Sequence, residues 1–311
     1  EVTHVKLGSK TGVLVSIADV KGKTISGSGS YIIRDTATNI KAAGLITAGK
    51  AANDAAGFKA LYGATEIQVT GWDSKVGTSI AQIGLDNPDV ATAAGKLSFT
   101  LPSASTFLTK LIVPNGGLKK DGVKIATLTD AMAQDLIFVD RIIFEGNNND
   151  LSIAGDAFDP DNKATRFKSL DGFTTTGTGT DITIADDGNN NGSEIDLQRI
   201  TNITGINSFT VQGDTKANVI QLSSVLSTSG KTTIDLKSDA EADEIYFNVD
   251  KSTFLADATS SPTVSYTTVN NFNTTHDTYG VYYTGFSGDG AGKYGIGRTR
   301  STTAGSSSKT A

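Results

Sequence analysis

Acidic and amide side chains gather in the segment 186–198 at spacings that could bind a hard cation. The candidate ligands are Asp187, Asn189, Asn191, Glu194 and Asp196. Oxygen ligands at alternate positions converge on one calcium ion, and Gly192 permits the sharp bend that such a loop needs. Position 12 of the loop is Gln198 instead of the usual glutamate. A plain Asn/Gly turn joining strands at 182–184 and 195–197 is the alternative interpretation.

Two other loops are rich in carboxylates. Their acidic residues are Asp156, Asp159 and Asp161 in one loop, and Asp239, Glu241 and Asp243 in the other. In the second loop the alternation places the acids on one side of an extended chain. Like charges this close repel unless a cation or water screens them. The three segments together predict Ca²⁺ as a cofactor, with solvated loops as the alternative.

The remaining residue types offer little for catalysis. There is no cysteine, which excludes disulfides and thiolate sites, and the two histidines, His4 and His276, are too far apart in sequence to suggest a zinc site or a catalytic triad. The GxGxxG pattern at 290–295 lacks the strand and helix that a dinucleotide site requires. Trp72 is the only tryptophan, so an aromatic-lined sugar groove is poorly supported. We predict that the protein is not an enzyme.

Composition favours a β-rich chain. Of 311 residues, 37% are hydrophobic and 19% are charged, with 34 glycines. The formal net charge of −6 argues against a nucleic-acid partner, which requires a basic surface. No apolar run approaches the roughly 18 residues of a membrane span.

One short pattern recurs: two apolar residues separated by a spacer, usually ending in glycine. It occurs at 67–71, 142–146 and 209–213, with weaker copies at 173–177 and 245–249. The last three copies end 36 residues apart, at 177, 213 and 249. Period-2 alternation predicts half-buried strands, and regular spacing suggests stacked repeats. The inward residues would be Ile67, Val69, Ile142, Phe144, Phe209, Val211, Ile245 and Phe247.

Helix signals lie mainly in the first half. A strand at 31–34 leads into a helix over 37–43, with Asp35 or Thr36 as its cap. A second helix is predicted over 48–62, where apolar residues repeat with helical spacing before the stop at Gly63.

Three more local elements are predicted. A capping box beginning at Thr127 predicts a short helix through Leu136. Further strands are predicted at 97–101 and 111–113.

These elements predict a mainly β fold: an elongated β-solenoid or stacked β modules, with a few short helices in the N-terminal half. We expect a mixed strand and short-helix region over 1–145, and a β-rich, solenoid-like region over 146–298. A Ser/Thr-rich tail or linker would follow over 299–311. An ordinary β-sandwich is the alternative for the second region.

The segment 31–71 resembles a repeat of large secreted bacterial surface proteins. The resemblance lies in Asp35-Thr36-Ala37-Thr38-Asn39-Ile40, the Ala-rich helix after it, and Ala64-Thr65-Glu66-Ile67-Gln68-Val69-Thr70-Gly71. Surface-layer proteins and type I-secreted, calcium-dependent adhesins carry such units. The glycine-rich nonapeptide of calcium-binding RTX repeats is absent from this sequence.

The resemblance implies a structural role outside the cell. The chain would be a subunit or segment of a surface layer, filament or adhesin that assembles with copies of itself. A cell-surface polysaccharide would be a further candidate partner. The alternatives are a receptor-binding fibre and a carbohydrate-active β-helix enzyme.

Overall fold

The computed structural model describes two compact units of the chain. The described residues are 2–43, 54–72, 80, 82–103, 107–162, 166–186, 194–250, 267–284 and 308–310. Unit 1 comprises Glu1–Ile125, Gln134–Gly146 and Phe167–Leu170, and unit 2 comprises Ala126–Ala133, Asn147–Arg166 and Asp171–Ala311. Strand content exceeds helix content, 36% against 19%, and the main sheets are parallel. The fold class is therefore α/β, where composition had predicted mainly β.

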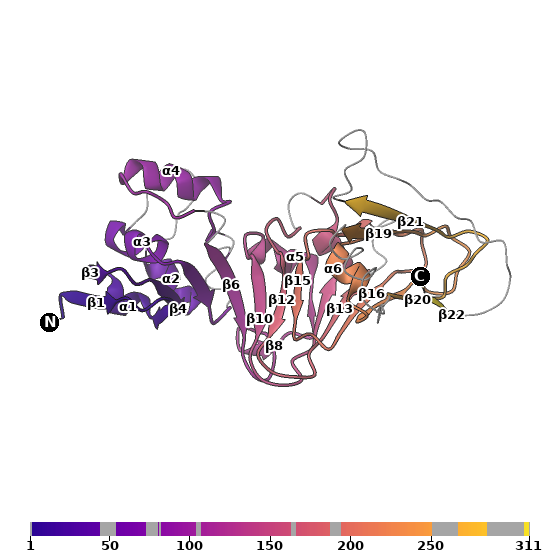
Figure 1. Cartoon of the computed structure of the whole chain (residues 1–311), viewed down its shortest axis with the longest axis horizontal. Coiled ribbons are helices and arrows are strands. Elements are labelled where there is room, and N and C mark those ends of the chain that lie inside the picture. Colours follow the sequence, from indigo (N-terminus) through magenta and orange to yellow (C-terminus); the bar gives the residue numbers. More distant parts are fainter. Residues whose placement is uncertain are drawn as a thin grey trace, which may run out of the picture. The chain divides into compact units, whose positions relative to one another are not determined.

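Parallel strand pairing organises unit 1 (Figure 1). Its larger set has the order β2-β4-β5-β6-β10, and every pair in it is parallel. These strands are β2 (Val13–Val15), β4 (Tyr31–Asp35), β5 (Glu66–Val69), β6 (Leu108–Val113) and β10 (Arg141–Phe144). Two smaller pairs are β1 (His4–Gly8) with β3 (Thr24–Gly27), and β7 (Lys119–Lys120) with β8 (Val123–Lys124). Parallel strands need crossover connections, and helical segments lie in each crossover of the larger set.

Polar residues begin the helices of unit 1. The helices are α1 (Ile17–Val20), α2 (Ala37–Ala42), α3 (Ala55–Tyr62), α4 (Pro88–Lys96) and the 3-10 helix η2 (Gln134–Leu136). The N-caps of the α-helices are Ser16, Thr36, Asp54 and Asn87, and each side chain accepts a backbone N–H from the first turn. The helix predicted over 37–43 is confirmed, and Thr36 is the cap.

The helix predicted over 48–62 begins later than expected. Asp54 has an extended backbone and caps the first turn, so α3 begins at Ala55. Residues 48–53 lie outside the described part of the chain. Gly63 ends the helix as predicted, but its φ of −82° is not left-handed. Backbone conformation is therefore not the reason for a glycine at this position.

The segment around α4 differs from the prediction. The strand predicted over 97–101 does not form, because the N–H groups of Leu97 and Phe99 bond back to helix carbonyls at Ala93 and Ala94. Helix α4 itself was not predicted, although an Asn-Pro pair begins it. The strand predicted over 111–113 is the end of β6 and is confirmed.

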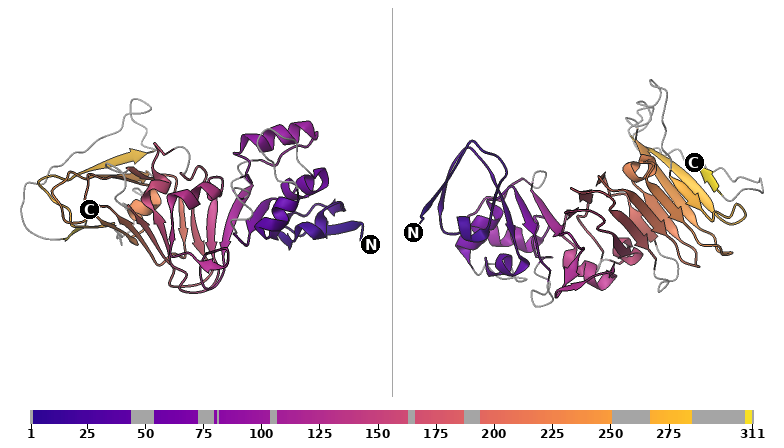
Figure 2. Two further views of the ribbon diagram at one scale, coloured as in Figure 1. Left: turned by 180° about the vertical axis from the view of Figure 1, so that it is seen from behind. Right: turned by 90° about the horizontal axis from the view of Figure 1, so that it is seen from below.

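Unit 2 contains three sets of parallel strands. Figure 2 shows strands of this unit lying side by side. One set pairs β12 (Gly172–Thr175) with β15 (Asn202–Thr204). A second has the order β9 (Thr127–Leu128), β11 (Leu151–Ala154), β13 (Asp181–Ala185), β16 (Ser208–Gln212), β18 (Thr232–Asp235) and β20 (Thr268–Asn270). The third has the order β14 (Glu194–Leu197), β17 (Val219–Leu222), β19 (Glu244–Asp250) and β21 (Thr278–Thr284).

Short helical turns and one antiparallel strand complete unit 2. They are α5 (Asp130–Ala133), the 3-10 helix η3 (Gly155–Phe158), α6 (Ser224–Thr228) and β22 (Ser308–Thr310). Strand β22 pairs antiparallel with β20, and the rest of the predicted tail over 299–311 lies outside the described residues. Helices thus occur in both halves of the chain, where the sequence predicted them only in the first.

The spacing of equivalent strands differs from the predicted 36 residues. Ile182 pairs with Phe209, 27 residues later, and Phe209 pairs with Thr232, 23 residues later. Phe173, Phe209 and Phe247, which the repeat aligned, belong to three different sets: β12, β16 and β19. The 36-residue repeat is therefore wrong, because alternation of apolar residues is a local property that every half-buried strand shares.

The burial that the alternation predicted is confirmed. All eight predicted inward residues lie in strands, and none is more than 5% exposed. Phe173 of the weaker copy is also fully buried and packs 5.9 Å from Phe209, ring centre to ring centre. The apolar positions of the pattern therefore form much of the core of each unit.

The short helix predicted through Leu136 forms as α5 followed by η2, but its cap differs from the prediction. Thr127 and Leu128 form strand β9, so the cap is Thr129, whose hydroxyl accepts the N–H of Met132. The strands predicted at 182–184 and 195–197 form as β13 and β14, which belong to different sheets. The segment 187–193 between them lies outside the described residues.

Candidate functional site

The carboxylates of unit 2 that are most deeply buried lie where strands of the third set begin. Strands β17, β19 and β21 start in register with one another. The residues directly before them, Asn218, Asp243 and Asp277, therefore follow one another from strand to strand. They are 0%, 1% and 5% exposed. We call these three residues, with the nearby Asp239, the carboxylate corner.

Hydrogen bonds join the members of the carboxylate corner. Asp243 Oδ1 accepts the backbone N–H of Asn218 at 2.8 Å and its side-chain amide at 2.9 Å. Asp277 Oδ1 accepts the backbone N–H of Asp243 at 3.1 Å, and its Oδ2 accepts that of Asn273 at 2.6 Å. Each carboxylate thus satisfies backbone donors where the chain enters a buried strand.

Burial and like charge oppose ionisation in the corner. Burial raises the pKa of Asp243 to about 6; the hydrogen bonds from Asn218 oppose this shift, and the negative charges of Asp277 and Asp239 add to it. Burial is also the main cause that raises the pKa of Asp277. Among the described residues, Oδ2 of Asp243 and Oδ2 of Asp239 are buried without a hydrogen-bond partner. A proton or a hard cation would relieve this repulsion.

The predicted acidic row of residues 239–243 is not formed. Asp239 Oδ1 accepts the backbone N–H of Glu241 at 2.9 Å, which bends the segment. Glu241 is consequently exposed, whereas Asp243 is buried. Two of the three predicted residues, Asp239 and Asp243, therefore belong to the corner, and Glu241 does not.

The other acidic segments approach each other in unit 2. Burial raises the pKa of Glu194 on β14, and the negative charges of Asp196, Asp159 and Asp161 raise it further. Asp156 lies in η3 and is 6% exposed. Two loops that the sequence treated as separate calcium candidates are thus within electrostatic reach of one another.

No ready-made metal site exists in the part of the chain that the structure describes. There, no group of three or more His, Cys, Asp and Glu side chains has an arrangement that could hold a metal ion. The predicted ligands Asp187, Asn189 and Asn191 lie outside that part. Calcium binding therefore remains a prediction.

Sequence reasoning missed two members of the corner. Neither Asn218 nor Asp277 was among the predicted site residues. Both share a signal with Asp243: an Asn or Asp stands directly before a strand with alternating apolar residues. Only the parallel register shows that these positions are neighbours.

We expect Asp243→Asn to remove part of the pH dependence of stability. Its folded pKa of about 6 exceeds the ordinary 3.8, so the folded protein binds more protons than the unfolded chain between these values. The stability that this carboxyl contributes is complete below about pH 4 and is lost as pH rises through about 6. The amide cannot ionise, so the variant should have a higher Tm than wild type above that pH. Each kcal/mol gained in the free energy of unfolding should raise Tm by about 2–4 °C.

Thermal melts in EGTA over about pH 4 to 8 would measure this difference. Glu241→Gln is the matched control, since that carboxylate lies in the same loop but is exposed. Parallel pH curves for wild type and Asp243→Asn would contradict the prediction.

Comparisons with protein-family models, with curated proteins and with solved structures give no match. Within the described ranges, no helix is long and apolar enough to cross a membrane. Function therefore rests on the geometry of the chain itself.

Proposed function

We propose that the protein is a structural subunit or segment of a secreted bacterial cell-surface assembly, and that unit 2 is a β-solenoid. The order in which the chain visits its strand sets supports the solenoid. It passes through β12, β13 and β14, then through β15, β16 and β17, and then returns to the second and third sets twice more. Winding of a solenoid produces this ordered return with parallel register.

Apolar stacking between successive turns gives the solenoid its stability. Ile195, Ile220 and Ile245 are paired in register through the third set, and all three are fully buried. Burying one such side chain contributes about 1.5–3 kcal/mol. Each turn thus depends on its neighbours, and the same surface recurs from turn to turn. A recurring surface suits the side-by-side packing of a surface layer, filament or adhesin.

Calcium is the cation we propose for the acidic segments of unit 2. Its support is the convergence of Asp239, Asp243 and Asp277, together with the unpartnered buried oxygens of the first two. Since these residues do not form a ready-made site, the side chains would have to close around the ion. Binding to the folded state alone would stabilise it by about 2.7 kcal/mol at a hundredfold excess of calcium over Kd.

Calcium-dependent assembly is the test of this function. We expect the full chain to form ordered polymers in about 1 mM calcium, visible by electron microscopy and light scattering, and to melt higher than in EGTA. Magnesium should not substitute, because it dehydrates reluctantly. Asp243→Asn should lose much of the calcium-dependent rise in Tm, and Glu241→Gln should keep it.

Two outcomes would overturn different parts of the proposal. A monodisperse monomer at every calcium concentration would remove the assembly role. Identical melting curves in calcium and EGTA would remove the cation and leave the carboxylate corner as a hydrogen-bonded turn.

A further inference from the structure

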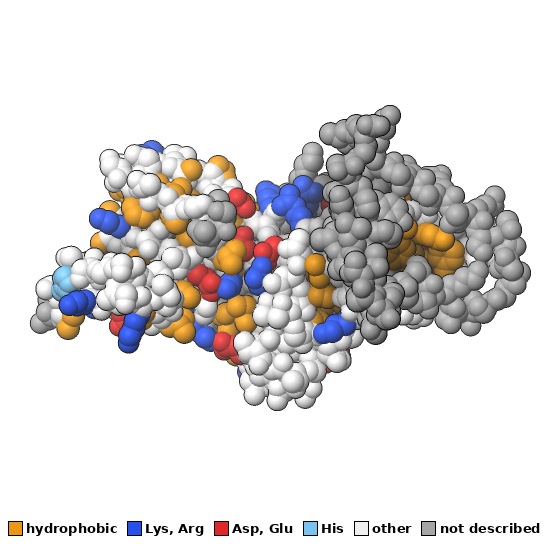
Figure 3. Space-filling model, in the orientation of Figure 1, with side chains coloured by type: hydrophobic (Ala, Val, Ile, Leu, Met, Phe, Trp, Pro, Cys, Tyr) orange, Lys and Arg blue, Asp and Glu red, His pale blue; other side chains and the backbone are white. Residues whose placement is uncertain are grey.

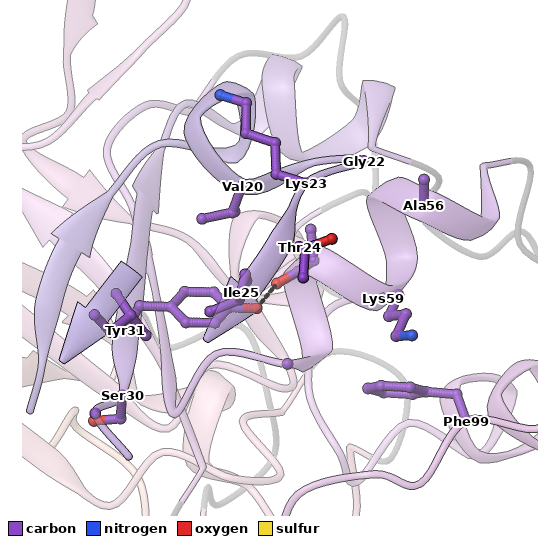
Figure 4. A pocket seen from close by; sticks show the side chains of 14 residues that line it. Val20, Gly22, Lys23, Thr24, Ile25, Ser30, Tyr31, Ala56, Lys59 and Phe99 are labelled. Atoms are coloured by element: carbon purple, nitrogen blue, oxygen red, sulfur yellow. Dashed lines mark hydrogen bonds between the residues drawn. The ribbon is translucent and has the colours of Figure 1, made fainter. Parts of the chain in front are cut away.

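A cavity in unit 1 has the size of a small-molecule site. Its volume is about 650 Å³, within the roughly 300–1,000 Å³ typical of ligand pockets. It lies between the β1–β3 pair, the turn from α1 into β3, helix α3 and the residue Phe99 after α4 (Figure 4). All of these elements belong to unit 1, so the cavity is independent of the carboxylate corner.

The wall beside helix α3 is fixed by close packing. The Tyr31 hydroxyl donates to the carbonyl of Ala60 at 2.8 Å, and burial raises the pKa of Tyr31 to about 12. Tyr31 is therefore neutral and presents its ring to the cavity. A Cβ at Gly63 would lie 2.6 Å from the Tyr31 hydroxyl oxygen, which explains the glycine at the end of α3. A wall held in this way is formed before any ligand arrives.

The cavity lining includes two charged residues, Lys23 and Lys59. No acidic side chain lies among the residues that line the cavity. Lys23 is engaged at the rim, where its Nζ donates to the carbonyl of Ala18 at 3.2 Å. Lys59 is exposed, and within the described ranges its side chain forms no hydrogen bond or ion pair. The Lys59 ammonium is therefore available to an anion.

An aromatic ring, that of Phe99, lines the same cavity as this ammonium. Figure 4 shows Lys59 and Phe99 on the same side of the cavity, with Thr24 between them and Tyr31. Phe99 is held edge-on against Phe58 at a ring-centre distance of 6.0 Å. The arrangement offers a cation, a ring face and a hydroxyl within one mostly apolar cavity.

The ion pairs of unit 1 show how this ammonium differs from other lysines. Lys110 pairs with Glu66 at 2.5 Å, and Lys120 pairs with Asp135 at 3.1 Å. Figure 3 likewise shows acidic and basic side chains interspersed among the described residues on the face of the molecule that it displays. Lys59 instead faces a cavity whose lining has no carboxylate.

We infer that this cavity binds a small organic monocarboxylate with an aromatic body. The carboxylate pairs with the Lys59 ammonium, the ring packs on Phe99 and the apolar wall, and the Thr24 hydroxyl supplies a hydrogen bond. The cavity would give the proposed surface module a ligand-binding site, yet it does not depend on that role.

Binding of 2-naphthoate to the full chain, measured by calorimetry, tests the inference, with neutral 2-naphthamide as the isostere. We expect 2-naphthoate to bind with a Kd below about 1 mM. Lys59→Met keeps the aliphatic stem and should weaken 2-naphthoate about fivefold, the effect of one partly exposed ion pair, while leaving 2-naphthamide unchanged. Phe99→Leu should weaken both. Lys96→Met, on a different helix, is the control and should change neither.

Two results would overturn the inference. One is the absence of 2-naphthoate binding at that concentration. The other is equal binding by wild type and Lys59→Met with both proteins folded, as judged by their melting curves. Loss of assembly in calcium would bear on the proposed function but not on this cavity.

Discussion

We expect Phe209→Ala to lower the free energy of unfolding by about 3–5 kcal/mol, the usual cost of truncating a buried aromatic side chain. Phe209 is fully buried in β16, between β13 and β18, and packs against Phe173. Truncation removes contacts with neighbouring strands on both sides and leaves a cavity that the paired backbone cannot close. Urea unfolding followed by circular dichroism would measure the loss.

Thr210→Ala is the matched control for this change. Thr210 is the next residue of the same strand and is only partly buried, so its replacement should cost less than about 1 kcal/mol. Equal losses for the two variants would mean that strand pairing, and not the buried face, dominates the stability of unit 2.

Gly172→Ala should be nearly as damaging, for a different reason. An added Cβ would lie 2.1 Å from the backbone oxygen of Asn202, the residue that pairs with Gly172 between β12 and β15. Backbone atoms cannot swing aside as a side-chain end can, so the two strands must separate locally. We expect a loss of about 3 kcal/mol, at the upper end for overpacking.

Unfolding curves, with protease sensitivity near residues 172–175, would measure this effect. Gly71→Ala is the control, because a Cβ there meets nothing within 4 Å and its φ is not left-handed. If Gly172→Ala unfolded like Gly71→Ala, β12 and β15 would be farther apart than the structure places them.

Local patterns of the sequence predicted individual strands but not their partners. Ile67, Ile142 and Phe209 were all correctly placed in buried strands, because side chains alternate between faces in any strand. Sheet membership depends on register between residues far apart in sequence, and no local pattern encodes it. For the same reason the 36-residue spacing joined strands that belong to different sheets.

The candidate site shows the same limit. Asp239 and Asp243 were identified from their charge, but Asp277 is 34 residues beyond Asp243 and becomes its neighbour only through the pairing of β19 with β21. Glu241 was wrongly included, because the alternation assumed an extended chain where a turn forms. The charged residues of the sequence therefore located the carboxylate corner, but long-range strand pairing determines which residues belong to it.

The small sequence separation between paired strands of unit 2 has a consequence for how the chain folds. Each parallel pair in the second and third sets joins residues between 23 and 35 positions apart, as with Phe209 and Thr232 or Ile234 and Val269. Each new strand therefore pairs with a strand that lies only a short distance before it in the sequence. Loop closure over such distances carries a modest entropic cost, and low sequence separation favours fast folding. Unit 2 can acquire order progressively from its N-terminal end, as a chain does when it emerges slowly from a ribosome or a secretion channel.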